Sequence, residues 1–209
     1  MAVKELVKVW DGKNLIKENI EFLRVPTKPV TFPVSKYIEQ IINDLIDTFK
    51  AVPCAGIASN QIGYDQKIFI GMKHDHDFSI KDDPSQNLDE VEPDPDNYEI
   101  YINPEIKNFD SSSTQLGDEG CLSLPHVTLN LERYDKIKVA YYNLEGKSMP
   151  KPPKPLKGFI SRLFQHELDH LNGKLMLESK NIFNAQIAPE SDEYKGLTMQ
   201  LMKYLGIIT

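Results

Sequence analysis

Two stretches of the chain place apolar residues at the spacing of an amphipathic helix. In residues 35–52, large apolar side chains recur every three or four positions after Ser35, which can cap a helix. A second helix is predicted over residues 156–172, and Gly173 follows it as a residue that favours a helix end. Weaker periodicity predicts a third, C-terminal helix over about residues 191–205.

Between the helices, short segments rich in β-branched and aromatic residues predict strands. They are residues 67–72, 98–102, 127–133 and 136–143, with the apolar run KLMLE at 174–178 as a further candidate. The strands are unevenly spaced and do not alternate regularly with helices as parallel βαβ units do. The pattern therefore predicts an α+β fold with mostly antiparallel sheets packed around a central helix, for which 156–172 is the candidate.

The length and composition fit a single domain. Of the 209 residues, 40% are hydrophobic and 26% are charged, so we expect residues 1–209 to form one soluble domain. Residues 73–97 differ from the rest because they are acidic and contain three prolines. We expect a solvated surface insertion there rather than a part of the core.

Charge and hydropathy argue against two classes of partner. The net charge is −7, so no nucleic-acid partner is predicted, although a local basic patch is compatible with that total. No stretch approaches the roughly 20 apolar residues of a membrane-spanning helix, and the N-terminus lacks the apolar run of a signal peptide. The two cysteines, Cys54 and Cys121, allow one disulfide but no disulfide scaffold. We therefore expect a protein of the cytoplasm or of an organelle matrix.

The segment HELDH at residues 166–170 suggests metal chemistry. Residues i and i+4 project from the same face of an α-helix, so His166 and His170 can bind one ion together. Glu167 lies about 100° round the helix, where it is free to take a proton from a metal-bound water. Such five-residue patterns also arise by chance. However, this helix is otherwise mostly apolar, and buried histidines and acids are costly without a partner such as a metal.

A catalytic metal site needs a third protein ligand. No histidine follows His170, and Glu178 is the only nearby acid on a following element. Upstream, Cys121 in the segment DEGCLSL offers a thiolate, and two histidines with one cysteine leave the fourth tetrahedral position for water. The alternative for Cys121 is a buried free thiol that packs as a small hydrophobic side chain.

Three motifs in order resemble those of the peptide deformylases. CAGIASNQ at 54–61 resembles the family's G-x-G-x-A-A-x-Q, while EGCLS at 119–123 and HELDH at 166–170 match its E-G-C-L-S and H-E-x-D-H. The first motif departs from the family at Cys54 and Ser59, where glycine and alanine are usual. The similarity spans about residues 28–178.

The resemblance implies an activity and a metal. Family members hydrolyse the formyl group from the initiator N-formylmethionine of new polypeptides and release formate, so N-formylmethionyl peptides are the expected substrate. One divalent ion would be held by Cys121, His166 and His170, with Fe²⁺ expected and Zn²⁺, Ni²⁺ or Co²⁺ compatible with these ligands. Asp169 is expected to support the site rather than to bind the metal.

The resemblance also assigns roles to residues around the metal. Glu167 is the expected general base, and the Gln61 side chain and the Leu122 backbone N–H are the expected donors to the oxyanion. The substrate is expected to bind as an extended strand that pairs with backbone groups near Gly56 and Gly120, and Ile57 and Leu122 are expected to line an apolar pocket for the methionine side chain.

Two departures from the family create further expectations. In many members an arginine soon after the second motif pairs with the motif glutamate, but Thr128 stands near that place, so Arg133 or Arg162 is expected to pair with Glu119. Cys54 should lie in or beside the substrate cleft, the alternative being a thiol that fills a small buried space.

Two other functions stay open at this point. The first is a zinc peptidase of the H-E-x-x-H type, which the cysteine ligand disfavours. The second is a non-catalytic, deformylase-like binding protein, which the intact ligand set and Glu167 disfavour. Release of formate from a formylated peptide, measured against cleavage of internal peptide bonds, distinguishes these functions.

Overall fold

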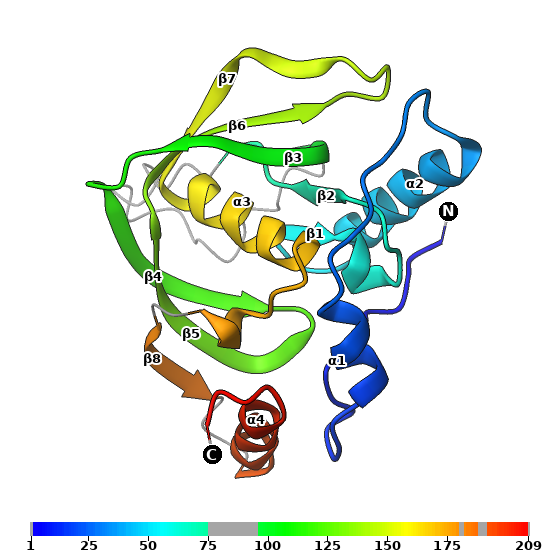
Figure 1. Cartoon of the computed structure of the whole chain (residues 1–209). Coiled ribbons are helices and arrows are strands. Elements are labelled where there is room, and N and C mark those ends of the chain that lie inside the picture. Colours follow the sequence, from blue (N-terminus) through cyan, green and yellow to red (C-terminus); the bar gives the residue numbers. More distant parts are fainter. Residues whose placement is uncertain (1, 75–95, 180–181, 188–191, 209) are drawn as a thin grey trace, which may run out of the picture.

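Two antiparallel sheets with the helix α3 (Gly158–Leu171) between them form the centre of the computed structural model (Figure 1). The structure describes residues 2–74, 96–179, 182–187 and 192–208. Of the acidic insertion expected at 73–97, residues 75–95 lie outside the described residues. The antiparallel pairing throughout both sheets, with helices interposed, confirms the predicted mixed fold with mostly antiparallel sheets.

The larger sheet has five strands in the order β1-β2-β3-β6-β7, and the smaller has three in the order β4-β5-β8. The strands of the larger sheet are β1 (Gly56–Ala58), β2 (Ile68–Gly71), β3 (Glu99–Phe109), β6 (Lys136–Tyr142) and β7 (Ser148–Lys157). Those of the smaller sheet are β4 (Thr114–Cys121), β5 (Leu124–Tyr134) and β8 (Ile182–Ile187). β1 and β4 are therefore edge strands, and each has an unpaired side within its sheet.

Among the described residues, three α-helices accompany α3: α1 (Lys17–Leu23), α2 (Lys36–Ala51) and α4 (Asp192–Tyr204). The predicted cap of α2 is confirmed, because the Ser35 side chain accepts a hydrogen bond from the Ile38 backbone N–H. The predicted C-terminal helix corresponds to α4, whereas the short α1 was not predicted. None of the helices in the described part of the chain is long and apolar enough to cross a membrane.

Several strand predictions need correction. The apolar run at 174–178 is not a strand: it contains a 3₁₀ turn, Met176–Glu178, and its leucines and methionine are buried in the core. β4 and β7 were missed because glycines and acids interrupt β4 and four prolines interrupt β7. Proline is tolerated in β7 because this strand lies at the edge of its sheet. Because β7 runs to Lys157, α3 begins two residues later than predicted.

The face of α3 towards the larger sheet is apolar and anchors the helix. Phe164 makes edge-to-face contacts with Phe69 and Tyr101, with ring centroids 5.2 and 5.3 Å apart. Leu163 and Leu171 belong to the same buried cluster. This packing fixes the rotation of α3 about its axis, so its other faces are turned towards the smaller sheet and towards β1 at the edge of the larger sheet.

Replacing Gly173, which follows α3, tests whether the C-terminal end of this helix requires a glycine. It has φ of +70°, and an added Cβ would lie 2.4 Å from the Arg24 carbonyl oxygen, a backbone atom that cannot move freely. Gly158→Ala at the other end of the helix is the matched control, since its φ is +59° but its Cβ would meet nothing within 4 Å. We expect Gly173→Ala to lower the free energy of unfolding by about 1–3 kcal/mol more than Gly158→Ala. If urea unfolding gives the two variants equal losses in the free energy of unfolding, the close approach of Gly173 to the Arg24 backbone has no effect on stability.

Candidate metal centre

The three predicted ligands meet although they come from separate parts of the chain. Cys121 ends β4, whereas His166 and His170 lie one turn apart on α3. Their candidate ligand atoms all lie within 4.8 Å of one another, and the Cys121 Sγ is 3.1 Å from the His170 Nε2. Both histidines are buried. The donor set is one thiol and two imidazoles, which suits a borderline-soft divalent ion.

The ring orientation of His166 is fixed by a hydrogen bond to the nitrogen that does not face the other candidate ligands. Its Nδ1 lies 2.9 Å from a carboxylate oxygen of Glu119, so the Nε2 is left for an ion. Glu119 in turn accepts two hydrogen bonds of 2.9 Å from Arg133 and one of 2.8 Å from Arg162. The expectation that Arg133 or Arg162 pairs with Glu119 is thus confirmed, and both do. Asp169 forms an ion pair with Arg133.

These partners determine the charge of the buried groups. Burial alone would raise the pKa of Glu119, but hydrogen bonds from His166 and Arg133 hold it well below its usual value. Burial likewise acts to raise the pKa of the Cys121 thiol, and the neighbouring His170 and His166 outweigh it and hold that pKa far below normal. Both groups are therefore anionic at neutral pH.

Glu167 has the opposite environment. Its side chain is buried, and its Oε2 has no hydrogen-bond partner among the described residues. Burial, against the opposing charges of His166 and His170, raises its pKa to about 7. Its other oxygen packs on Gly56, where an added Cβ would lie 2.7 Å away. A carboxylate that titrates near neutral pH can both accept and return a proton.

A cavity of about 360 Å³ opens in front of these groups, between the edge strands β1 and β4. Its walls include the predicted residues Gly56, Gln61, Gly120, Leu122 and Glu167, together with Cys121 and His166. Ile57 does not line it, because its side chain is fully buried in a separate cluster beneath α2. The expectation that Ile57 lines a pocket for the substrate is therefore wrong for this cavity.

Gln61 is held with its amide nitrogen towards the ligands. Its Oε1 accepts a hydrogen bond of 2.9 Å from the Ala58 backbone N–H, which leaves the Nε2 3.7 Å from the Cys121 Sγ. Leu122 lies in the two-residue turn between β4 and β5, directly after Cys121. The fold thus places a side-chain amide and a backbone turn next to the thiol.

Two apolar residues of α3 also line the cavity and were not predicted from the sequence. Phe159 and Leu163 precede Glu167 by eight and four residues, so they continue the same face of the helix. That spacing was a usable signal. Asn60 was also missed: its side chain donates a hydrogen bond of 2.7 Å to the His170 carbonyl oxygen, and no local pattern points to this contact.

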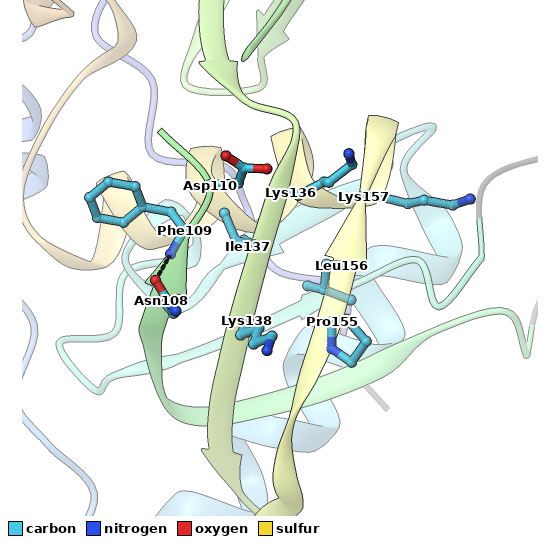
Figure 2. A pocket seen from close by; sticks show the side chains of 9 residues that line it. All are labelled: Asn108, Phe109, Asp110, Lys136, Ile137, Lys138, Pro155, Leu156 and Lys157. Carbon is cyan, nitrogen blue, oxygen red and sulfur yellow. Dashed lines mark hydrogen bonds between the residues drawn. The ribbon is translucent and has the colours of Figure 1, made fainter. Parts of the chain in front are cut away.

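A larger cavity, of about 620 Å³, lies elsewhere on the molecule, in the region of β3, β6 and β7. Figure 2 shows the side chains that line it, among them Lys136, Lys138 and Lys157. Neither cysteine and no histidine is among them. The candidate site is therefore chosen by its chemistry and not by the size of its cavity.

A cysteine and two histidines beside a buried glutamate are the residue types that a mononuclear metallohydrolase uses to bind its ion and to transfer a proton. The sequence model of one family, polypeptide deformylase, matches residues 13–186. The chain therefore belongs to the peptide deformylase family.

Individual relatives agree with this assignment. The chain is 33% identical over 156 residues to the peptide deformylases of Thermotoga petrophila and Cellvibrio japonicus, covering 75% of this chain and 79% of each relative. It resembles the crystal structure of peptide deformylase from Thermotoga maritima with a TM-score of 0.64 at 28% identity, covering 90% of this chain and 100% of that one. It also resembles the Met-Ala-Ser-bound class I type b peptide deformylase of Acinetobacter baumannii, with a TM-score of 0.65, 27% identity and coverage of 85% and 98%.

Replacing Glu119 tests the support of His166. Glu119→Gln removes the charge that balances Arg133 and Arg162, so we expect a loss of about 3–5 kcal/mol in the free energy of unfolding and a 10–100-fold weaker affinity for the metal. The matched control is Asp118→Asn. Asp118 is an exposed neighbour on the same strand and accepts a hydrogen bond from the Asn130 side chain. Urea unfolding and chelator competition measure the two effects. Equal behaviour of the two variants would contradict the assigned support.

Cys54 gives a prediction on reactivity. It lines the cavity and is half-buried, as expected, and it forms no disulfide with Cys121. Burial and then the charge of Glu167 raise its pKa to about 12, so the thiol stays protonated at neutral pH. We expect iodoacetamide to inactivate the metal-loaded enzyme slowly at pH 7.5 and faster as pH rises. Cys54→Gly should keep activity and resist the reagent, and inactivation of that variant at an unchanged rate would count against the assignment.

Proposed function

We propose that this chain is a metal-dependent peptide deformylase that removes the N-formyl group from the initiator N-formylmethionine of new polypeptides and releases formate. One observation carries the proposal. In a member of this family, Cys121, His166 and His170 lie together, and Cys121, His166 and Glu167 line one cavity. The proposed place of action is the compartment where such chains are made, the cytoplasm or an organelle matrix.

Cys121, His166 and His170 are the residues that would hold the ion. Ligand atoms of a tetrahedral ion lie roughly 3.4–3.8 Å apart at the usual bond lengths, and the three candidate atoms fall within 4.8 Å of one another. Fe²⁺ is the proposed ion, and Zn²⁺, Ni²⁺ and Co²⁺ accept the same ligands. When bound, the ion would acidify a water and polarise the formyl oxygen.

Glu167 is the proposed general base. Its unpartnered, buried Oε2 is a group that can take the proton of the attacking water and then give it to the leaving amine. Its position depends on Gly56, since any side chain there would meet the Glu167 carboxylate. The first motif therefore contributes to catalysis by leaving room for the base.

Gln61 and Leu122 are the proposed donors to the oxyanion. The formyl oxygen gains negative charge as water attacks the carbon, and preorganised N–H groups stabilise that charge. The Gln61 Nε2 is oriented in advance by the bond that its Oε1 accepts from Ala58. The Leu122 backbone N–H, in the turn after Cys121, is the second proposed donor.

The substrate is proposed to enter as an extended strand between β1 and β4. Both are edge strands that line the cavity, and Gly56 and Gly120 let a backbone approach closely. Leu122, Phe159 and Leu163 supply an apolar wall for the methionine side chain. The Acinetobacter baumannii relative, which was solved with Met-Ala-Ser bound, supports a methionyl peptide as the ligand class.

Glu167→Gln tests the proposed chemistry. Because Glu167 is not a proposed ligand, the variant should keep stoichiometric metal and lose several orders of magnitude in formate release from formyl-Met-Ala-Ser. Cys121→Ser is the contrasting variant, since a neutral hydroxyl is a much poorer ligand than a thiolate, and it should lose the metal. Metal analysis after anaerobic purification and a formate assay give the two readouts.

Three outcomes would contradict the proposal. Loss of metal in Glu167→Gln would make this residue a ligand, and near-normal formate release would remove it as the base. Cleavage of internal peptide bonds without formate release by the wild type would instead indicate a zinc peptidase.

A further inference from the structure

The strand β4 and the helix α3 run side by side with matching repeats. Alternate residues of β4 meet every fourth residue of α3 in four successive contacts, which we call the β4–α3 ladder: Gln115 with Gly158, Gly117 with Arg162, Glu119 with His166, and Cys121 with His170. Two residues of a strand rise about 6.7 Å, and four residues of a helix rise about 6 Å. The near-equal steps keep the two elements in register over the whole length of β4.

The last contact of the ladder lies inside the proposed metal site. Cys121 comes from β4 and both histidines come from α3, so the distance between thiol and imidazoles depends on how closely the strand lies against the helix. The last ladder contact before the candidate ligands is the one between Gly117 and Arg162.

Arg162 binds the strand at several points. Its Nη1 donates to the Gly117 carbonyl oxygen (3.1 Å) and to Glu119 (2.8 Å), and its Nη2 donates to the Gln115 carbonyl oxygen (2.9 Å). A further bond of 3.0 Å reaches the Leu131 carbonyl oxygen on β5. The residue is 4% exposed, so these bonds are shielded from competing water.

Gly117 makes this approach possible. A Cβ at this position would lie 3.0 Å from the Arg162 Cζ and from its Nη2, closer than carbon and nitrogen atoms normally approach. The guanidinium therefore occupies the space that a side chain on β4 would fill. Arg162 and Gly117 form one contact that can be disturbed from either side.

We propose that Arg162 is a positioning residue that holds β4 against α3 through Gly117 and thereby sets the spacing of Cys121 from the two histidines and the metal affinity of the site. The inference rests on the proposed metal site, but not on the identity of the substrate or on the reaction. Arg162 acts here through the strand as well as through Glu119, which distinguishes its role from that of Arg133.

The test measures Co²⁺ affinity by chelator competition, with the visible spectrum of bound Co²⁺ as a second readout of ligand geometry. Arg162→Met should raise the dissociation constant tenfold or more and shift the spectrum, because β4 loses the three bonds that Arg162 donates to it. Gly117→Ala keeps both Arg162 and Glu119 in the chain, but its Cβ would push the guanidinium away from β4. We expect it to raise the dissociation constant threefold or more. Arg162→Lys, which keeps one charged donor for Glu119 but cannot reach all the carbonyls, should fall between wild type and Arg162→Met.

The double variant separates one shared contact from two independent effects. If Gly117 acts through Arg162, then adding Gly117→Ala to Arg162→Met changes the dissociation constant no further. Gly71→Ala is the matched control: its Cβ would lie 3.3 Å from Leu163, another side chain of α3, so it loosens helix packing without touching the ladder. It should lower thermal stability and leave Co²⁺ affinity within twofold of wild type.

Several results would overturn the inference. Folded Arg162→Met and Gly117→Ala variants that bind Co²⁺ within twofold of wild type, or single effects that multiply in the double variant, would do so. If Arg162→Met does not fold, unchanged affinity in both Gly117→Ala and Arg162→Lys has the same force. Failure of the wild type to bind one equivalent of Co²⁺ would instead overturn the proposed metal site, and this inference with it.

Discussion

One buried carboxylate, that of Glu119, ties the chemistry of this protein to its fold. It accepts hydrogen bonds from Arg133 and Arg162 and orients His166, so a residue of β4 links β5 and α3 at the candidate ligands. Burying this many charges is costly, and their mutual attraction offsets the cost only while every partner is present. The cluster is therefore intolerant of partial change. That intolerance favours a single arrangement of the strands and the helix around the thiol and the imidazoles.

The helix α3 serves the core and the site with different faces. Phe164 and Leu171 bury apolar area against the larger sheet, where hydrophobic packing fixes the helix without specifying its polar contacts. Arg162, His166 and His170 face the smaller sheet, where hydrogen bonds and charge fix the position in detail. Such a division lets the core tolerate small changes in volume while the ligands keep their spacing.

The features that the sequence predicted well depend on the spacing of residues that are close together in the chain. The helical placement of the two histidines and the cap of α2 depend on residues within one or two helical turns, and the approach of the cysteine was expected from its motif. The features that were missed depend on contacts between distant segments. Proline-rich β7 is a strand only because it lies at a sheet edge, and the run at 174–178 is buried without being extended. Ile57 was placed beside the substrate, yet its side chain faces the opposite way, since a three-residue strand leaves no pattern from which its inner face can be read. Whether Glu119 pairs with one arginine or two was likewise undecidable, because β5 and α3 contribute one each.

Glu119 and Glu167 show how one centre gives two carboxylates opposite properties. Both are buried, and both lie next to His166 in space or in sequence. Glu119 has every oxygen bonded to a cation, so its pKa falls and it stays charged while holding its partners. Glu167 has an oxygen with no partner among the described residues, so burial dominates and its pKa rises to about 7. A buried oxygen without a hydrogen-bond partner is costly, and a catalytic role is one of the reasons for which proteins keep such a group. The separation of the two pKa values is thus the physical basis for proposing that one carboxylate supports the metal ligands and the other transfers protons.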